Sequence, residues 1–432
     1  MAVVILGGGL AGLSCGWRLL QRGVACTVHE RAPAPGGMAA SVTEAGFTFD
    51  RTGHWLHLRD DAVRAWVHEL LDGRLLEVER RARIRSHGVF TRYPFQANTF
   101  GLPQEVVDEC VSGFVQAHER HLRGDQPPPA DLREAFLQWF GPGICKHFMA
   151  PYNAKLWGVP TTEITAAWCS RFVPRPSLQE VVGGSTGDHA EGLGYNPRFV
   201  YPADGGIGTL ATRIADGLGE ALRLSDEAVE VRWQGRCVAF ADGDEAPYER
   251  LISSLPLPAL VGLLRPAPPD EVLRAAGRLR ATAVAHVDYG VRGAVNQGHH
   301  WVYFPAADVP FYRVGSYSNA APHLAPPGHG SLYVETSAPS GSGPPDWDAV
   351  LPRIRRALVA HGLIESEDAI VLERPRFIDG AYVLFDHAYA QSRQRVLNWA
   401  QSAGVELIGR YGRWTYSSME DAIIDGRRAA DR

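Results

Sequence analysis

The spacing of apolar residues changes twice over residues 2–30. An unbroken apolar run, AVVIL, ends at three glycines, and LAGLSCGWRLLQR then repeats its apolar residues with helical spacing up to Gly23. A second apolar run, ACTVHE, ends at Glu30. A buried strand, a helix and a second buried strand in this order predict a β–α–β unit with two parallel strands.

Helical spacing returns in two longer segments, 104–122 and 131–140, which the proline-rich turn RGDQPPP separates. Between residues 282 and 338 the pattern becomes strand-like instead. The apolar runs there are TAVAHVDYGV, HHWVYFP, FYRVGSYS and SLYVETSA, with glycine and proline between them. Such spacing predicts an antiparallel sheet.

Composition narrows the class of protein. The chain has 432 residues, of which 45% are hydrophobic and 21% charged, as in globular proteins of two or three domains. The net charge of -5 offers no basic surface for a nucleic acid. Six scattered cysteines without a C-x-x-C pair indicate reduced thiols. No apolar run is long enough to cross a bilayer, and the apolar start lacks the basic residues of a signal peptide. We therefore expect a cytoplasmic protein without nucleic-acid or membrane partners.

A glycine motif joins the first predicted strand to the first helix. Gly7, Gly9 and Gly12 form a G-x-G-x-x-G, and Glu30 ends the following strand. The glycines permit a tight turn, the approach of a pyrophosphate to the helix N-terminus and the close packing of helix on strand. Glu30 can accept hydrogen bonds from ribose hydroxyls. The complete strand–glycine–helix–strand–acid context predicts a dinucleotide site rather than a structural turn.

The residues after Glu30 favour FAD over NAD as the dinucleotide. RAPAPGGMAAS contains a second glycine pair, and no second G-x-G-x-x-G follows. This arrangement resembles FAD enzymes of the glutathione-reductase type, in which strands return late to the first sheet; ERLISSLPLPAL (249–260) and GVELIGRYG (404–412) are the candidates. The resemblance implies cofactor contacts at Gly7, Gly9, Leu10, Ala11, Gly12, Glu30, Arg31, Gly36, Gly37, Met38, Val229, Gly409, Arg410, Met419, Glu420 and Asp421.

The predicted fold class is α/β, with a Rossmann-like FAD-binding domain, a helical insertion and an antiparallel-sheet substrate domain. The FAD-binding domain is expected to be discontinuous, with residues 1–80, 200–260 and 400–432. The helical domain is expected at 100–190, and the substrate domain at 261–399 together with 81–99. A last helix from Met419 should turn the amides of residues 419–421 toward the flavin ring, where negative charge is favoured.

The middle of the chain carries a family resemblance. PYNAKLWGVPTTEITAAW, preceded by RYPFQ and followed by YNPRFVYPADGGIGTL, closely resembles UDP-galactopyranose mutases, especially the eukaryotic type. HWVYFPAADVPFYR, FDHAY and GRYGRWTY follow in the family's order. The family interconverts pyranose and furanose forms of a nucleotide-linked hexose without net redox change. The resemblance implies attack of N5 of reduced FAD on the anomeric carbon, with loss and recapture of the nucleoside diphosphate.

The same resemblance assigns substrate contacts. Tyr93, Phe95 and Gln96 match the family's uracil pocket, and Asn153 and Trp157 match its nucleotide side. A pyrophosphate leaving group requires arginine and phenol donors. The residues that match that role are Arg313, Tyr303, Tyr389 and Tyr416. A second phosphate arginine is expected at Arg171, with Arg175 as the alternative. Tyrosines in strands are by default packing residues, so these assignments depend on one another.

The sugar and flavin side completes the predicted site. His54 in RTGHW matches a histidine of a loop beside the flavin, although the family has GGH where this chain has TGH. Asn196 and Trp301 match sugar contacts, and Arg410 matches an arginine between flavin and sugar. Ala320 stands where the eukaryotic family has a substrate-holding tyrosine, which leaves the sugar open. The predicted catalytic residues are His54, Arg171, Arg313 and Arg410.

The sequence is compatible with three hypotheses of function. The first is a mutase acting on UDP-galactose or on another NDP-hexose or deoxyhexose, with NADPH or NADH as candidate reductants. The second is an FAD oxidoreductase of the amine-oxidase or protoporphyrinogen-oxidase type, and the third is a non-catalytic flavin protein. The histidine pairs His54/His57 and His299/His300 lack the spacing of a zinc site, so no metal is predicted. The sequence does not indicate an oligomeric state.

Overall fold

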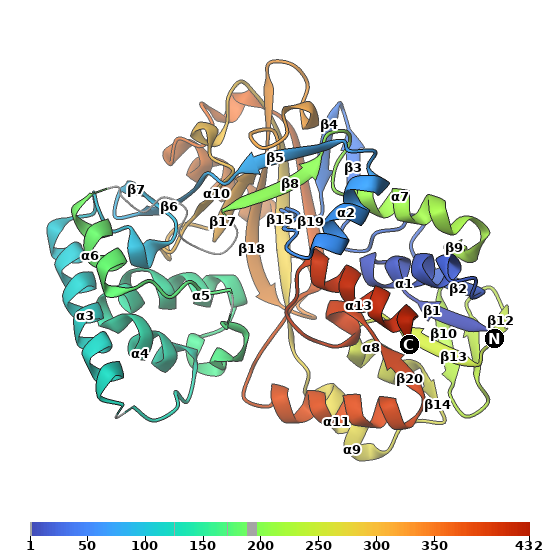
Figure 1. Ribbon diagram of the computed structural model, residues 1–432. Coiled ribbons are helices and arrows are strands. Elements are labelled where there is room, and N and C mark those ends of the chain that lie inside the picture. Colours follow the sequence, from blue (N-terminus) through green and yellow to red (C-terminus); the bar gives the residue numbers. More distant parts are fainter. Residues whose placement is uncertain (1, 125, 171, 188–196) are drawn as a thin grey trace.

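The computed structural model describes residues 2–432 except 125, 171 and 188–196. Figure 1 shows a parallel sheet with its helices on the right, a larger sheet in the middle and a group of helices on the left. Each of these parts contributes to the candidate site.

The first part is a five-stranded sheet in the order β20-β13-β1-β2-β9, and all of its neighbouring strands are parallel. The predicted β–α–β unit is confirmed, and so is the return of two late strands to the side of β1. The segment after β20 is the exception, because Gly409–Gly412 forms the short helix α12 rather than more strand. The elements are β1 (Val3–Leu6), α1 (Leu10–Gln21), β2 (Cys26–Glu30), α7 (Gly208–Leu218), β9 (Leu222–Leu224), β13 (Arg250–Ser253), β20 (Val405–Leu407) and α13 (Met419–Asp431).

Two glycines allow the helices of this part to approach closely. A Cβ atom on Gly12 would collide with the carbonyl oxygen of Gly7, so α1 can lie against the end of β1 only with glycine there. A Cβ atom on Gly426 would collide with the carbonyl oxygen of Ala11, so α13 packs directly on the first turn of α1. The last helix of the fold is thereby fixed against the first.

The three strands between β9 and β13, together with β14 after β13, form a second, four-stranded sheet in the order β12-β11-β10-β14. The side chain of Asp226 contacts Nδ1 of His29 at 2.8 Å, and its amide donates to the carbonyl oxygen of Glu30 at 2.9 Å. These contacts hold the start of this sheet beside the end of β2. Its elements, and the helices that follow or pack nearby, are β10 (Ala228–Arg232), β11 (Cys237–Phe240), β12 (Glu245–Pro247), β14 (Leu264–Arg265), α8 (Leu257–Leu263), α9 (Asp270–Gly277) and α11 (Tyr389–Ser402).

The large sheet has seven strands in the order β19-β15-β18-β17-β16-β6-β7. The four predicted strands of residues 282–338 are confirmed, but the sheet is mixed rather than purely antiparallel, because β16 and β6 pair in parallel. β6 comes from a distant segment of the chain, so no hairpin dictates its direction. The strands are β6 (Ala82–Ser86), β7 (Val89–Arg92), β15 (Ala281–Arg292), β16 (Trp301–Tyr303), β17 (Arg313–Ser316), β18 (His329–Pro339) and β19 (Ile370–Val383).

The two faces of the large sheet differ in chemistry. One face is apolar and packs through Val287, Val314 and Val334 against α10 (Trp347–Ala360), in a cluster that includes Ile354 and Leu358. Since side chains alternate along a strand, the neighbouring residues face the opposite way. That opposite face carries the polar and aromatic residues of the candidate site.

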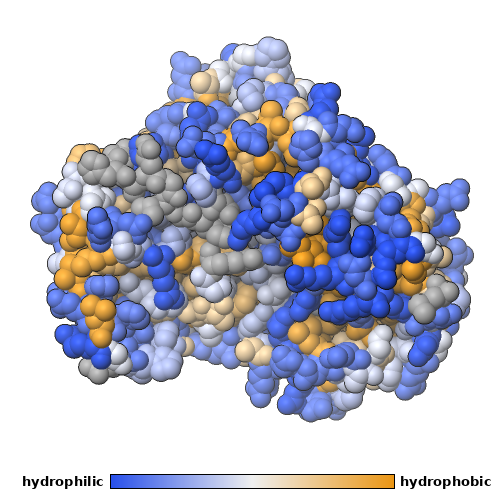
Figure 2. Space-filling view, viewed as in Figure 1, coloured by the Kyte–Doolittle hydropathy of each residue, from blue (hydrophilic) through white to orange (hydrophobic). Residues whose placement is uncertain are grey.

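The helical part lies on the left of Figure 1, below β6 and β7. The predicted helices at 104–122 and 131–140 are confirmed with slightly longer bounds. Figure 2 shows hydrophobic side chains on the surface of this part. The large apolar residues that are exposed here include Phe100, Leu122 and Val182. The helices are α3 (Gln104–Arg123), α4 (Leu132–Ile144), α5 (Ala150–Trp157) and α6 (Leu178–Thr186).

Short elements connect these parts. Asp50 ends a small hairpin, and its carboxylate accepts hydrogen bonds from Ser41, Tyr201 and the amide of Ile207 at 2.6, 2.6 and 3.0 Å. These bonds fix the segment that leads to His54. The elements are β3 (Ser41–Glu44), β4 (Phe47–Asp50), α2 (Asp61–Leu70), β5 (Leu75–Glu79) and β8 (Arg198–Pro202).

Two absences hold for the described part of the chain. None of its helices combines the length and apolar character that spanning a bilayer requires. Nor do three or more His, Cys, Asp or Glu side chains of this part gather where they could hold a metal ion.

His286 makes the stability of the fold depend on pH. It lies fully buried on β15, and neither ring nitrogen has a hydrogen-bond partner among the described residues. Burial, reinforced by Arg376, lowers the pKa of His286 to about 3, whereas the unfolded chain protonates this residue below pH 6.5. The stabilisation is therefore complete above pH 6.5 and is lost as the pH falls toward 3.

Between pH 7 and pH 5, protonation of His286 should cost the wild type about 2 kcal/mol of unfolding free energy. His286→Phe lacks this group, so its unfolding free energy should fall by that much less. Denaturant titrations at the two pH values measure this difference. His121→Gln, at an exposed position on α3, is the control and should keep the wild-type pH dependence. Equal losses in the wild type and His286→Phe would contradict the prediction.

Candidate active site

The turn between β1 and α1 is shaped to hold phosphate. Gly7 adopts a φ of 101°, which favours glycine, and Gly9 precedes α1 without any side-chain cap for the helix N-terminus. No acidic residue lies in the first helical turn. A Cβ atom on Gly9 would meet nothing within 4 Å, so the space in front of the helix is open. Exposed N-terminal amides, the helix dipole and this space together fit a pyrophosphate.

Glu30 fixes the first glycine turn, and a main-chain bond joins that turn to the second glycine pair. Its Oε2 accepts the amide of Gly8 at 2.7 Å, and its Oε1 accepts the amide of Ala32 at 2.8 Å. The amide of Gly36 donates to the carbonyl oxygen of Gly8 at 2.8 Å. A carboxylate has about four lone-pair positions, so Glu30 can also accept ribose hydroxyls, as predicted. Val229, another predicted cofactor contact, lies on β10 with 45% of its surface exposed.

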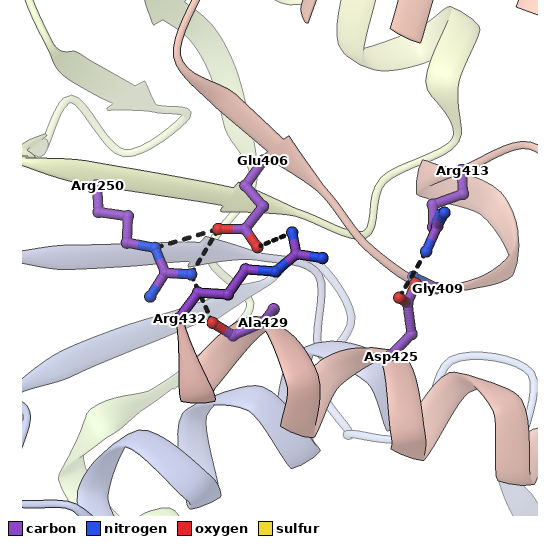
Figure 3. A network of polar contacts seen from close by, with 7 residues as sticks. All are labelled: Arg250, Glu406, Gly409, Arg413, Asp425, Ala429 and Arg432. Atoms are coloured by element: carbon purple, nitrogen blue, oxygen red, sulfur yellow. Dashed lines mark hydrogen bonds and ion pairs between the residues drawn. The ribbon is translucent and has the colours of Figure 1, made fainter. Parts of the chain in front are cut away.

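The segment after β20 closes the same end of the parallel sheet. Gly409 has a φ of 71° and donates its amide to Asp425 at 2.7 Å, while Arg413 pairs with the other oxygen of Asp425 at 2.8 Å. Figure 3 shows this contact beside a second network, in which the carboxylate of Glu406 forms ion pairs with Arg250 and Arg432. Helix α13 thereby fixes the turn that carries Arg410.

The start of α13 differs in part from the prediction. Ser418 and Asp421 form a reciprocal cap, in which the amide of Asp421 donates to Ser418 Oγ at 3.2 Å. The Asp421 amide is therefore turned to its own cap and not to a ligand. The buried carboxylate of Glu420 accepts the amides of Arg59 and Asp60. Both acidic side chains fix the helix start.

A row of paired residues crosses the polar face of the large sheet. In register from β19 to β16 the row is Arg376, His286, Glu335, Arg313 and Tyr303. Paired residues on neighbouring strands face the same side of a sheet. The sheet therefore presents the predicted diphosphate ligands Arg313 and Tyr303 side by side. Trp301 lies two residues before Tyr303 on β16, and so on the same face of the sheet.

Arg313 is held by a buried carboxylate. Its guanidinium pairs with both oxygens of Glu335, with Nη2 at 2.9 Å from Oε1, and Glu335 is fully buried. Burial works against the charge of Arg313, but Glu335 more than offsets it and holds the pKa of Arg313 well above its ordinary value. The side chain keeps 19% of its surface exposed, so a fixed cation faces the site.

A second cation lies among aromatic rings. The guanidinium carbon of Arg410 is 4.7 Å from the ring centroid of Tyr416 and 5.1 Å from that of Tyr382. These two rings stack with centroids 6.2 Å apart, and the ring centroid of Trp157 is 6.0 Å from that of Tyr382. Arg410, Tyr416 and Trp157, which were predicted separately, are thus brought together.

Tyr382 replaces Tyr389 in this group. Tyr389 is buried at the start of α11, where its hydroxyl donates to the carbonyl oxygen of Trp414 at 2.8 Å and its ring lies against Phe385. The prediction that Tyr389 faces a diphosphate is therefore wrong, because its donor is already used inside the fold. Tyr382 is the next-to-last residue of β19, and its contacts with Arg410 and Tyr416 place it at the site.

Tyr93, from the predicted base pocket, lies in a cluster of aromatic rings. The ring centroids of Tyr93 and Tyr303 are 5.3 Å apart, and Tyr152 lies at the same distance from Tyr303. Phe95, however, is fully buried and stacks on Phe148, so its ring packs inside the fold. Tyr152 was not predicted, although it precedes Asn153 in the same motif.

Two buried amides lie near this cluster. The Nε2 of Gln96 donates to the carbonyl oxygen of Pro174 at 2.7 Å, which leaves the side-chain oxygen as its acceptor. Asn153 donates through Nδ2 to the carbonyl oxygen of Met149, and its Oδ1 is buried without a partner among the described residues. An unpaired buried acceptor is costly, so a ligand donor at Asn153 would be favourable.

His54 lies on a turn that follows Asp50. Thr52 has a φ of 64°, and the next residue, Gly53, is pressed against Tyr333, since a Cβ atom there would collide with its hydroxyl. Burial, reinforced by the charges of Arg410 and Arg313, lowers the pKa of His54 to about 4. The imidazole is therefore neutral at pH 7 and lies within the field of both cations.

Four further predictions concern single residues. The indole of Trp301 donates to the hydroxyl of Tyr303 at 2.8 Å, so the tryptophan orients that phenol. Arg175, the alternative phosphate ligand, lies with its guanidinium carbon 3.7 Å from the ring centroid of Trp139 on α4. The predictions for Arg171 and Asn196 fall outside the described residues.

Comparisons with known proteins show what the whole chain resembles. A family model described as flavin containing amine oxidoreductase matches residues 10–432. The 3-amino-4-hydroxybenzoate 2-monooxygenase PtmB3 of Streptomyces platensis is 25% identical over 325 residues, which are 70% of this chain and 67% of the relative. The solved structure of a reduced UDP-galactopyranose mutase has a TM-score of 0.92 and 26% identity, and the match covers 100% of this chain and 94% of the other. Putrescine oxidase bound to putrescine has a TM-score of 0.68 and 16% identity, with coverage of 100% and 98%. These likenesses confirm the predicted FAD cofactor and the predicted resemblance to the mutases.

Proposed function

The chain belongs to the flavin-containing amine oxidoreductase family, and we propose that within it the protein is a nucleotide-sugar mutase. It interconverts the pyranose and furanose forms of an NDP-hexose, with UDP-galactose as the first substrate to test. The likeness to a UDP-galactopyranose mutase over the whole chain supports this proposal.

The observation that carries the proposal is the grouping of two cations and three phenols on one side of the large sheet. Arg313 and Arg410 supply the charge, and Tyr303, Tyr382 and Tyr416 supply hydroxyl donors beside them. Such donors suit a diphosphate, which gains negative charge as the bond to the anomeric carbon breaks. An amine substrate, being cationic, would be repelled by both arginines.

Different residues would hold the FAD, the diphosphate and the sugar. The residues around Gly9 and Glu30 hold the FAD, which when reduced supplies the nucleophile for the anomeric carbon. Arg313, fixed by Glu335, and Arg410 hold the departing diphosphate close to the sugar so that it can be recaptured. The neutral imidazole of His54 can accept or donate a hydrogen bond at the sugar side without adding charge.

The test is conversion with oxidised and with reduced protein. Purified protein should be yellow and, under anaerobic dithionite, should convert UDP-galactofuranose to UDP-galactopyranose, as followed by chromatography. The oxidised protein should be inactive, and dTDP- and GDP-hexoses in the same assay identify the base and sugar. NADPH and NADH can be tested in place of dithionite. Conversion that is undiminished with oxidised flavin would contradict the proposed function.

A second candidate is an oxidase or oxygenase with net redox turnover. The family itself and the likeness to the Streptomyces platensis monooxygenase favour it. Hydrogen peroxide release, or oxygen incorporation into an organic product, would support this candidate. The absence of any pyranose–furanose conversion in the same preparation would then exclude the mutase.

A further inference from the structure

Lys155 lies on α5 between two residues of the predicted nucleotide site, Asn153 and Trp157. Four main-chain carbonyl oxygens lie within hydrogen-bond distance of its ammonium nitrogen, at 2.6 to 3.0 Å, and share its three N–H donors. The four carbonyls belong to Phe304, Ala306, Val309 and Phe311. All of them come from the single connection that joins β16 to β17. One side chain therefore holds a whole loop.

The loop depends on a cation at this point. The connection contains Pro305 and Pro310, which have no N–H group to offer to neighbouring carbonyls. Four carbonyl oxygens that converge on one point repel each other unless a cation lies between them. Among the described residues, the main-chain bonds of this loop lie only at its base, where the amide of Phe304 donates to Tyr312 and the amide of Tyr312 donates to Glu335. The ammonium of Lys155 therefore supplies the charge that orders its interior.

The identity of the residue supports a specific role. Lys155 and Lys146 are the only lysines among 43 lysine and arginine residues. Elsewhere the chain uses arginine for positive charge, but a planar guanidinium cannot fill a compact group of carbonyls as an ammonium can. Lys146 is different, because its side chain is 64% exposed and pairs with Glu109 on the surface.

The loop held by Lys155 connects two parts of the diphosphate site. It begins directly after Tyr303 and ends directly before Arg313. Helix α5 itself has other attachments to the sheet, since the hydroxyls of Ser337 and Thr282 donate to the carbonyls of Leu156 and Trp157 at 2.6 and 2.8 Å. Loss of the ammonium should thus loosen the loop while α5 stays in place.

We propose that Lys155 is a positioning residue, whose ammonium group fixes the 304–311 connection and thereby sets the diphosphate ligands Tyr303 and Arg313 against the nucleotide side of the site on α5. The role in substrate binding rests on the proposed function, but the ordering of the loop does not.

The test compares Lys155→Ala, Lys155→Met and Lys155→Arg in the full-length flavoprotein, with Lys146→Met as the matched control. Hydrogen exchange without any nucleotide should become faster at residues 304–312 in the three Lys155 variants and stay unchanged in α7. UDP affinity should fall about 10-fold or more, while uridine affinity should stay within about twofold, because only UDP uses the diphosphate ligands. Lys146→Met should behave like the wild type in every measurement.

A small cation provides the decisive readout. Lys155→Ala leaves the four carbonyl oxygens in place and makes space for K⁺ or NH₄⁺ between them, so either cation should restore slow exchange and UDP affinity. The side chain of Lys155→Met fills that space, so this variant should not respond to the cations. Unchanged exchange in the Lys155 variants, or faster exchange throughout the protein, would overturn the proposal. If the wild type binds no UDP, the proposed function fails, and the exchange and rescue results still decide the role of Lys155.

Discussion

Replacing Arg313 by lysine is expected to lower kcat/KM for the nucleotide-sugar by about 10²- to 10³-fold while the protein stays folded and yellow. Lysine can still neutralise the buried Glu335, so the fold keeps its ion pair. It cannot reproduce a fork that holds the carboxylate on one side and presents a fixed cation on the other. Steady-state kinetics with reduced protein, together with the flavin absorbance of each preparation, measure both effects.

Variants of Glu335, the partner of Arg313, distinguish an effect on stability from an effect on activity. Arg313→Met alone leaves a fully buried carboxylate without its cation and should cost roughly 3–5 kcal/mol of unfolding free energy. Adding Glu335→Gln should recover most of that loss but none of the activity. A double variant that regained mutase activity would show that Arg313 acts only through packing, and wild-type kinetics in Arg313→Lys would refute its role at the diphosphate.

Replacing Gly9 by valine is expected to give a folded protein that is colourless. A side chain at Gly9 meets no protein atom within 4 Å of its Cβ, and the φ of -79° is open to any residue. The added methyl groups would instead occupy the space in front of α1, where a pyrophosphate approaches the helix N-terminus. Circular dichroism and thermal unfolding should remain close to those of the flavin-free wild type, while bound flavin falls below detection.

A second glycine provides the matched control. Gly262 on α8 also has open space around its Cβ, so Gly262→Ala should retain full flavin content. Gly12→Ala should behave differently from both, because its Cβ collides with the carbonyl of Gly7 and disturbs the packing itself. Flavin retention in Gly9→Val would contradict the assignment of this turn as the pyrophosphate site.

The sequence was most informative where a single local pattern decides the structure. The turn around Gly7 and Gly9 follows from the glycine spacing between an apolar strand and a helix, and the structure contains it at the predicted residues. The strand β19 was missed, because Pro375, Gly380 and several charges interrupt its alternation. Proline is tolerated there because β19 is an edge strand.

The site shows the same limit at the level of single residues. Tyr382 and Tyr389 lie close together in the aromatic string AYVLFDHAY, and no local pattern tells which one faces the ligand. Only the strand register and the position of Trp414 settle the choice, and both depend on contacts between distant segments. The pairing of Arg313 with Glu335 is likewise a matter of register between β17 and β18. Such contacts are absent from the local sequence.

The strand order of the parallel sheet also dictates when the protein can fold during its synthesis. The buried strand Val3–Leu6 finds its neighbour on one side only at residues 250–253, and that neighbour is covered only by residues 405–407. A chain still on the ribosome therefore carries an apolar strand that lacks one of its two neighbours until residues 250–253 have been made. Flavin uptake is expected to be a late event, and chaperones that bind exposed apolar segments should engage this chain until α13 closes on α1.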